Sequence, residues 1–419
     1  MLWRTRPKAG SGPDSRRWAG QPLPVRLIEV ATVLERPERP RTLAAWANSP
    51  RWRGAIAPPR TVLEAFVFVL LPLTGPAMVV AYLIGAYQPR PGVVDGIYFP
   101  DGGFLFDLHV MWQAGHDVVT GHSPYPFVYP APAAFLMAPF GALPWSVAVV
   151  FFTLTLIGAS GLSLWLLGVR DWRCYSVTLA AMPMASSIMI GTLSPFLALG
   201  AAVAWRYRDR RWIVAAAITA VVVTKILLWP LAIWLIATRR IRSAATTIGL
   251  GIAVTFGSWA LLGFDGLADY PHRLGRIAGL EQDKSYSPFA LLRALGLSSG
   301  SARLAVLVLT AAALLVIFRV ARGTDGDRRS FVIALIVGLL AAPIVWLHYL
   351  VVLIVPLALY RPRFGIAWLI PLLYWLLPGQ ESHGSVGNIL AAMSLTAAAL
   401  ALAAWRRQEP TPMSALSTS

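Results

Sequence analysis

The sequence predicts an all-α polytopic membrane protein with about twelve transmembrane helices. Of the 419 residues, 57% are hydrophobic and only 13% are charged, whereas soluble domains carry roughly 25% charged residues. Apolar runs long enough to cross a bilayer alternate with short arginine clusters, which is the charge pattern of membrane topology. The formal net charge of +17 therefore indicates membrane lipid as a partner and argues against nucleic acid.

The first 60 residues contain no apolar run of spanning length. They hold twelve Arg and Lys residues, four Asp and Glu residues and nine prolines, a composition that buries too little apolar surface to fold. We expect 1–60 to be a disordered basic tail on the cytoplasmic side, without a signal peptide. The membrane domain is expected over 61–405, and a second cytoplasmic tail over 406–419.

Arginine clusters divide the apolar runs and set the predicted topology. The positive-inside rule places each cluster in the cytoplasm, so every apolar stretch between two clusters must go out and return. The clusters lie at 170–173, 206–211, 239–242, 319–329, 361–363 and 406–407. The predicted single spans are 61–87, 145–168, 243–262, 302–318, 364–377 and 389–404, with hairpins over 174–205, 212–238 and 331–360.

This topology brings the polar turns of the chain to one side of the membrane. Both termini are expected in the cytoplasm of a plasma-membrane protein, and the chemical site is expected to face outward. Most of the later outer loop is expected to be simply solvated. The outer segments are the loops 88–144 and 263–300, Lys225, and the turns 191–195, 343–348 and 378–383.

The richest polar stretch is 104–145, between two apolar segments. Residues 107–121 predict a helix, because Asp107, Met111 and Ala114 share one face at i, i+4, i+7 spacing. An extended path is then expected, since four prolines exclude regular helix. They are Pro124, Pro126, Pro130 and Pro132. The polar and aromatic residues of this stretch are Asp107, His109, Trp112, Gln113, His116, Asp117, His122, Tyr125 and Tyr129.

Three blocks in this stretch carry a family resemblance. They read Asp-Leu-x-Val-x-Trp-x-Ala-Gly from Asp107, Gly-x-Ser-Pro-Tyr from Gly121, and Tyr-Pro-x-Pro-x-Ala from Tyr129. This series resembles the first outer loop of glycosyltransferase family 87. Fainter similarities extend over 62–405. The family consists of polyprenyl-phosphate-mannose-dependent α-mannosyltransferases of the GT-C class, and Trp112 stands where it usually has Tyr.

The resemblance implies an inverting enzyme that transfers mannose from polyprenyl-phosphate mannose to a glycolipid or lipid-linked acceptor at the outer face. Asp107 matches the catalytic base of the family, although a carboxylate there can also cap a helix. Lys225 falls where the family often has a lysine near a proline, and His348 falls where it tends to have Trp-x-His-His, with Tyr349 in place of the second histidine. We expect both Lys225 and His348 to contact the donor phosphate, although a lone histidine among apolar residues can also be structural. A lysine at the membrane rim can instead snorkel. The implied substrate-binding residues are His109, Trp112, Gln113, Tyr125, Tyr129, Trp346, Ser287 and Arg293.

No metal or cofactor is expected. The single Cys174 excludes a cysteine cluster, and no P-loop or HExxH pattern occurs. The triplet Asp325-Gly326-Asp327 has the spacing of a metal-binding DxD motif, but it lies between arginines in a short cytoplasmic loop and predicts a turn.

Three alternative functions remain open. One is transfer of another sugar, such as arabinose, from the same carrier. The second is a lipid or polysaccharide transporter, which is expected to show inverted repeats that this sequence lacks. The third is a cell-envelope scaffold with an inactive site.

Overall fold

The computed structural model describes residues 69–87, 92–94, 97–99 and 105–404, which are almost entirely helical. The predicted tails, 1–60 and 406–419, lie outside these residues. The α-helices are α5 (Leu71–Tyr87), α6 (Phe106–Val119), α7 (Ala131–Gly141), α8 (Trp145–Leu166), α9 (Trp172–Ala180), α10 (Met182–Ile190), α11 (Ser194–Arg206), α12 (Arg211–Thr224), α13 (Pro230–Ala237), α14 (Ile241–Leu261), α15 (Tyr270–Glu281), α16 (Pro288–Ala294), α17 (Ser299–Val320), α18 (Gly326–Ala341), α19 (Ile354–Tyr360) and α20 (Val386–Ala404). The 3₁₀ helices are η3 (Ile226–Leu228), η4 (Gln282–Lys284), η5 (Leu347–Leu353) and η6 (Ile366–Leu376), and β1 (Gly92–Val94) pairs antiparallel with β2 (Ile97–Phe99).

Within the described part of the chain, four helices are long and apolar enough to cross a bilayer, namely α8, α14, α17 and α20. Helices α10 and α11 add a fifth if they are taken as one span bent by 119°. A multi-pass membrane protein is therefore confirmed, but the predicted count of about twelve spans is not. Several predicted half-hairpins are short helices, such as α9, α13 and α19 with 9, 8 and 7 residues.

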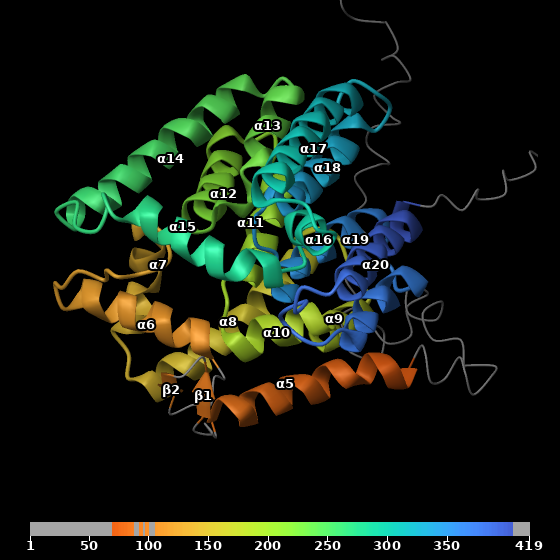
Figure 1. Ribbon diagram of the computed structural model, residues 1–419. Coiled ribbons are helices and arrows are strands. Elements are labelled where there is room, and N and C mark those ends of the chain that lie inside the picture. The colour runs from red at the N-terminus through yellow and green to blue at the C-terminus, as the bar shows by residue number, and fades with distance from the viewer. Residues whose placement is uncertain (1–68, 88–91, 95–96, 100–104, 405–419) are drawn as a thin grey trace, which may run out of the picture. The chain divides into compact units, whose positions relative to one another are not determined.

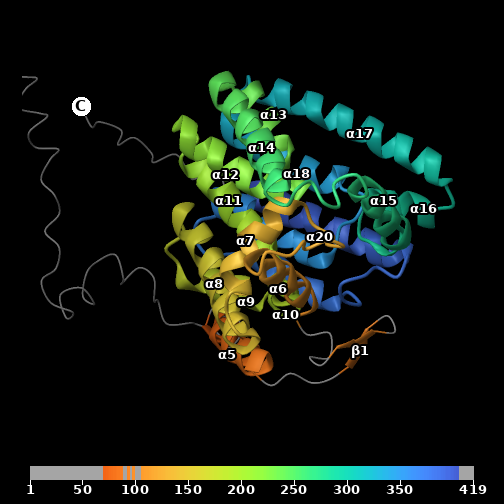
Figure 2. The same ribbon diagram turned by 90° about the vertical axis from the view of Figure 1, so that its left-hand side faces the viewer.

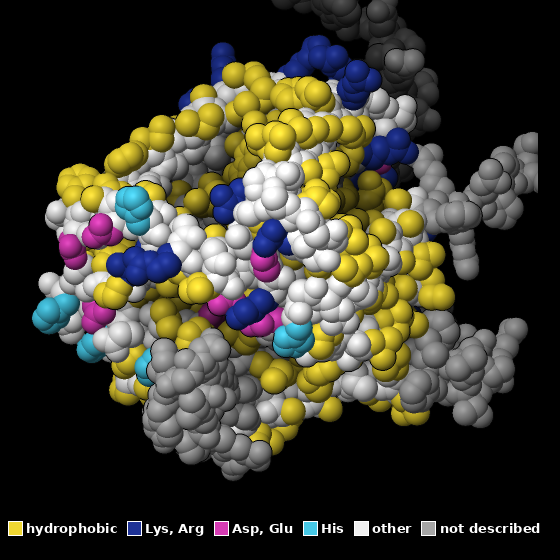
Figure 3. Space-filling model, in the orientation of Figure 1, with side chains coloured by type: hydrophobic (Ala, Val, Ile, Leu, Met, Phe, Trp, Pro, Cys, Tyr) yellow, Lys and Arg dark blue, Asp and Glu magenta, His cyan; other side chains and the backbone are white. Residues whose placement is uncertain are grey.

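The outer surface of the long helices is apolar. On α17, Leu304, Leu307 and Leu315 are each more than 60% exposed, which in water would form an unusually large apolar patch. Figure 3 shows hydrophobic side chains over α14 and α17, whereas charged side chains of both signs gather over α15 and α16. These long helices thus present lipid-compatible surfaces.

Helices α6 and α7 pack side by side, as both Figure 1 and Figure 2 show. A Cβ atom at Gly115 would collide with the backbone of Met137, and one at Gly141 would collide with the backbone of α6. Small residues at the contact therefore allow the two helices to approach closely. Helix α12 packs against α14, and α17 packs against α18.

The apolar runs are broken at the three predicted positions. Gly191 ends α10 in the left-handed region with φ 75°. Lys225 separates α12 from η3 in an extended conformation, with φ −154° and ψ 110°. Residues 342–346 separate α18 from η5. Each break leaves backbone polar groups without helical partners, which membrane proteins tolerate only inside the protein.

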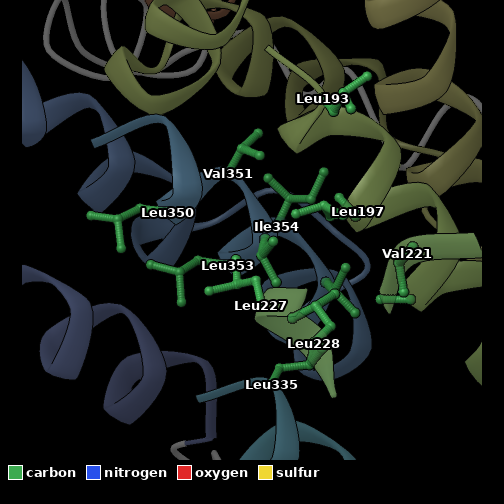
Figure 4. Close-up of a cluster of buried hydrophobic side chains, with 14 of the residues drawn as sticks. Leu193, Leu197, Val221, Leu227, Leu228, Leu335, Leu350, Val351, Leu353 and Ile354 are labelled. Atoms are coloured by element: carbon green, nitrogen blue, oxygen red, sulfur yellow. The ribbon is translucent and has the colours of Figure 1, made fainter. Parts of the chain in front are cut away.

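A core of aliphatic side chains lies beneath these breaks. Figure 4 shows leucine, isoleucine and valine side chains from α11, α12, η3, α18 and η5 gathered around Leu228 and Ile354. Leu228 is fully buried, and Leu353 is 3% exposed. Such close packing fixes the backbone of η3 and η5. Lys225 directly precedes η3, and His348 lies within η5.

Ion pairs join the segments at the arginine-rich end. Asp327 accepts hydrogen bonds from Arg208 Nε at 2.9 Å and from Arg240 Nη1 at 2.8 Å, and Asp209 pairs with Arg240 at 2.9 Å. Asp325 has φ 56° and pairs with a nearby arginine. Asp325 therefore ends the predicted turn, whereas Gly326 and Asp327 already belong to α18, and both carboxylates of the DxD triplet contact guanidinium groups.

Two local predictions were wrong. Pro132 was expected to prevent a helix, but α7 begins at Ala131, because proline is tolerated in the first turn, where no N–H partner is needed. Much of the loop 263–300 was expected to be simply solvated, yet it forms α15 and α16. Pro271 and Pro288 stand in the first turns of these helices.

Candidate active site

Asp107 lies in the first turn of α6, where the helix dipole favours a carboxylate. The start of this helix is fixed by Leu105, whose backbone N–H donates to the carbonyl of Met189 at 2.6 Å. Gly191 follows two residues later, and a Cβ there would approach Leu108 Cβ to 2.5 Å. The break after α10 therefore positions the helix that carries Asp107.

The Asp107 carboxylate is half-buried and bound to Tyr129. Tyr129 Oη donates a hydrogen bond to Asp107 Oδ2 over 3.3 Å. Burial raises the pKa of Asp107 above its ordinary value, while the positive charge of Lys225 and the Tyr129 hydrogen bond oppose that rise. Burial and the Asp107 charge also raise the pKa of Tyr129, which therefore remains a protonated donor. A carboxyl with a raised pKa is a stronger base once it is deprotonated.

Lys225 reaches the same region from the break between α12 and η3. Its Nζ is buried and makes no hydrogen bond to any described residue. The ammonium lies 3.7 Å from the centroid of the Tyr349 ring and 5.7 Å from that of Tyr129. Cation–π contacts of this kind offset only part of the desolvation of an ammonium. The arrangement can therefore bind an anion.

His348 stands at the start of η5, next to Tyr349. The two rings meet edge to face with their centroids 4.7 Å apart. His348 Nδ1 lies 2.9 Å from Gln380 Oε1, and Nε2 is buried without a partner among the described residues. A carboxamide oxygen only accepts hydrogen bonds, so Nδ1 carries the proton, and Nε2 of the neutral ring is an acceptor.

The Gln380 loop is held by a distant tyrosine. Tyr286 Oη lies 3.0 Å from the carbonyl oxygens of both Gly379 and Glu381, and Ser382 N donates to the carbonyl of Lys284 at 2.7 Å. Gln380 is thus fixed on both sides and in turn orients the His348 ring. We refer to Asp107, Tyr129, Lys225, His348, Tyr349 and Gln380 as the Asp107 site.

Sequence reasoning did not assign Tyr349 or Gln380 to this site. Neither residue was given a role, and Gln380 lay only within the predicted outer turn 378–383. The available signals were a tyrosine in an otherwise apolar run and an amide in a short polar loop. Their contacts join residues far apart in the chain, so no local pattern gives them.

Three predicted substrate-binding residues lie on other faces of α6. His109 meets Trp145 edge to face with centroids 5.0 Å apart, and Trp112 Nε1 donates to the carbonyl of Leu143 at 3.1 Å. Gln113 is exposed and donates to a carboxylate one turn later at 3.0 Å. None of these contacts includes the Asp107 site, and their substrate roles stay predictions.

Tyr125 and Trp346, two further predicted substrate-binding residues, lie in different surroundings. The Tyr125 ring stacks on Trp259 with centroids 4.6 Å apart and meets Tyr270 edge to face. Its hydroxyl is buried without a partner among the described residues. Trp346 is half-buried directly before η5. Tyr125 therefore joins the segment between α6 and α7 to the end of α14 and the start of α15.

Ser287 and Arg293 make structural contacts on and around α16. Ser287 Oγ caps the helix by accepting from Ala290 N at 3.1 Å, and it donates to the carbonyl of Pro343 at 3.0 Å. Arg293 pairs with Asp283 at 3.3 Å. These contacts account for both side chains without a substrate, and their binding roles stay predictions.

In the part of the chain that the structure describes, no three His, Cys, Asp or Glu side chains are grouped to hold a metal ion. Asp325 and Asp327, which have the DxD spacing, contact arginines. The Asp107 site offers a carboxylate, phenols, an ammonium and an imidazole.

The fold and the site together define a multi-pass membrane protein that holds a half-buried carboxylate beside a buried ammonium. The chain belongs to glycosyltransferase family 87, which it matches over residues 127–347. This confirms the family resemblance and the prediction of a glycosyltransferase. The matched region contains Tyr129 and Lys225 and begins after Asp107.

Two curated proteins are similar along most of the chain. Both are named polyprenol-phosphate-mannose-dependent alpha-(1-2)-phosphatidylinositol pentamannoside mannosyltransferase. The protein from Mycolicibacterium smegmatis is 25% identical over 68% of this chain and 72% of its own length. The protein from Mycobacterium tuberculosis is 26% identical over 81% of this chain and 78% of its own length. No solved structure matches the chain.

Proposed function

We propose that this protein moves a mannosyl residue from polyprenyl-phosphate mannose to a glycolipid or lipid-linked acceptor. The family and the names of the two relatives support mannose as the sugar and a polyprenyl phosphate as its carrier. Those names give a phosphatidylinositol mannoside as the relatives' acceptor, which supports a glycolipid acceptor for this chain as well. The broken helices around the site support a GT-C-type fold.

The proposed site faces the outer side of the plasma membrane, with both termini in the cytoplasm. Arg208, Arg240 and Arg361 lie in clusters between apolar helices, and the positive-inside rule assigns such clusters to the cytoplasm. A lipid-linked donor fits this orientation, because it presents its sugar at a membrane surface.

One observation carries the proposed mechanism. The Asp107 carboxylate and the Lys225 ammonium both contact the Tyr129 side chain, at its hydroxyl and near its ring respectively. A base and a cation are thus held close together, as transfer from an anionic phosphate requires. Lys225 makes no hydrogen bond, to Asp107 or to any other described residue, so its N–H groups are available to a phosphate oxygen.

In the proposed reaction, an acceptor hydroxyl oxygen attacks C1 of the mannosyl group from the face opposite the phosphate. The C1–O bond to the phosphate breaks, and the configuration at C1 inverts. Asp107 takes the hydroxyl proton, and polyprenyl phosphate leaves with its bonding electrons. Lys225 stabilises the charge that grows on that phosphate. The phosphate needs no strong acid in order to leave.

His348 supports the same reaction through its unpaired nitrogen. The neutral ring, protonated at Nδ1, accepts a hydrogen bond at Nε2 from a hydroxyl of the donor sugar. Gln380 fixes the orientation of the ring. His348 therefore binds the donor at a second point beside Lys225.

Purified membranes supplied with radiolabelled polyprenyl-phosphate mannose test the proposal. Membranes that contain the protein should form a labelled, lipid-extractable product, and membranes with Asp107→Asn should not. Product formation from polyprenyl-phosphate arabinose, with none from the mannose donor, would contradict mannose transfer. Absence of product with either donor, in the presence of extracted native lipids, would favour transport or a scaffold.

A further inference from the structure

At the arginine-rich end, a cavity of about 130 Å³ opens between α18, α19 and the end of α20. This is far more than the space that one water molecule needs. None of its lining residues belongs to the Asp107 site. The lining residues are Asp325, Arg328, Arg329, Tyr360, Arg361, Ala403 and Ala404.

The lining is strongly basic. Three guanidinium groups face one carboxylate, which leaves a net charge of +2 on the lining side chains. The cavity also lies beside the first turn of α18, which begins at Gly326, and the helix dipole adds positive potential there. Arginine presents several N–H donors in a planar fork that matches the oxygen atoms of a phosphate.

The guanidinium groups are partly held in place. Arg328 pairs with Asp325, and its guanidinium carbon lies 4.6 Å from the centroid of the Tyr360 ring. Arg361 donates from Nη2 to the carbonyl of Leu402 at 3.3 Å. Arg329 is exposed, and its backbone N–H donates to the carbonyl of Asp325 at 3.1 Å. Among the described residues, no hydrogen bond or ion pair holds its guanidinium group. The Arg329 side chain can therefore turn toward a ligand that is bound between Arg328 and Arg361.

We propose that this cavity binds a phosphate-bearing anion, and that the phosphate belongs to the headgroup of an anionic membrane lipid. Helix α20 is long and apolar enough to span a bilayer, and the cavity adjoins its last residues, Ala403 and Ala404. A spanning helix ends at the depth of the lipid headgroups, and basic pockets between spanning helices bind anionic headgroups there. The Asp325 carboxylate competes with the lipid phosphate for Arg328.

Native mass spectrometry of the full-length protein in neutral detergent tests this site. Phosphatidylglycerol should bind the wild type more tightly than phosphatidylcholine does. Arg329→Gln should weaken phosphatidylglycerol binding by about tenfold, because a hydrogen bond to a charged group is lost. Arg242→Gln, at an exposed arginine of another cluster, is the matched control and should leave the affinity unchanged.

Asp325→Asn provides a test of the opposite sign. Asparagine tolerates the left-handed backbone of this position, and the substitution removes the competing negative charge. Phosphatidylglycerol should then bind more tightly than it binds the wild type.

Competition with inorganic phosphate distinguishes the source of the anion. Displacement of the lipid only at concentrations far above those of phosphatidylglycerol supports the lipid headgroup. If inorganic phosphate binds more tightly than the lipid and responds to both substitutions, the cavity takes a soluble phosphate and the lipid assignment is wrong. Equal lipid affinities in the wild type, Arg329→Gln and Asp325→Asn would overturn the site altogether.

Discussion

Asp107 combines two properties that a helix cap does not need, a raised pKa and a phenol donor aimed at its carboxylate. Asparagine keeps the shape of aspartate and caps helices about as well, but it cannot take a proton. We expect Asp107→Asn to slow sugar transfer by about 10² to 10⁴ fold, with expression and donor binding near wild type. Single-turnover assays with the labelled donor measure this effect.

Asp117→Asn is the matched control for this substitution. Asp117 lies on the same helix and contacts Gln113 instead of Tyr129, so its loss should leave turnover close to wild type. Near-normal transfer by folded Asp107→Asn protein would remove Asp107 from the mechanism.

The Tyr129 hydrogen bond predicts a shift in pH dependence. The bond stabilises the charged form of Asp107 and so lowers its pKa against the effect of burial. In Tyr129→Phe the pKa should rise further, so kcat/KM should begin to fall at a higher pH than in the wild type. A pH profile of kcat/KM measures this acid limb.

Tyr125→Phe is the comparison for that profile. The hydroxyl lost in Tyr125→Phe makes no hydrogen bond to a described residue. The acid limb of the kcat/KM profile of this variant should therefore lie at the same pH as in the wild type. If kcat/KM of Tyr129→Phe fell at the same pH as in the wild type, or at a lower pH, a group other than Asp107 would limit the rate.

Lys225 is predicted to bind the donor phosphate. Lys225→Met keeps most of the apolar stem and removes the charge, so donor affinity should weaken by about 1.5–3 kcal/mol, the range for a hydrogen bond to a charged group. Lys284→Met, at a partly exposed lysine 3.8 Å from Glu281, should leave donor affinity unchanged. Equal dissociation constants for wild type and Lys225→Met would return Lys225 to the snorkelling interpretation.

Among the elements, the break at Gly191 has the most direct effect on the site. Gly191→Ala places a Cβ against Leu108 in a left-handed backbone conformation, which costs about 1–2 kcal/mol before any displacement of α6. We expect a lower unfolding temperature and slower transfer. Thermal unfolding followed by size-exclusion chromatography measures the stability change.

Gly158→Ala is the matched substitution in a helix. Gly158 lies within α8 with no atom within 4 Å of an added Cβ, so alanine should preserve stability or raise it slightly. If Gly191→Ala were as stable and active as Gly158→Ala, the contact between Gly191 and α6 would not position Asp107.

Some helices and breaks around the site could be predicted from the sequence, and others could not. The helix at Asp107 was predicted from residue spacing, and the break at Lys225 was predicted from an isolated charge in an apolar run. Both features are present in the structure. The helices of 263–300 were missed because this polar segment was expected to be a solvated loop, whereas Pro271 and Pro288 stand in the first turns of α15 and α16. The Gln380–His348 bond depends on Tyr286 from a third segment, and no local pattern encodes it.

For the whole molecule, the arginine clusters predict which ends of the helices face the cytoplasm. Cysteines placed singly at Arg242 and Arg363, both exposed, should be shielded from a membrane-impermeant thiol reagent in intact cells. A cysteine at the exposed Ser123 should react. A Cys174→Ser background removes the native thiol, which is buried. Labelling at Arg242 without labelling at Ser123 would reverse the proposed orientation.

The buried ammonium of Lys225 has a consequence for the balance between stability and activity. A cation held away from water without a hydrogen bond destabilises the fold until an anion lies beside it. An apolar side chain at this position would remove that desolvation cost and raise the stability of the protein. It would also weaken binding of the polyprenyl-phosphate donor. Selection for stability would therefore favour an apolar residue at position 225, whereas selection for transfer activity would favour lysine.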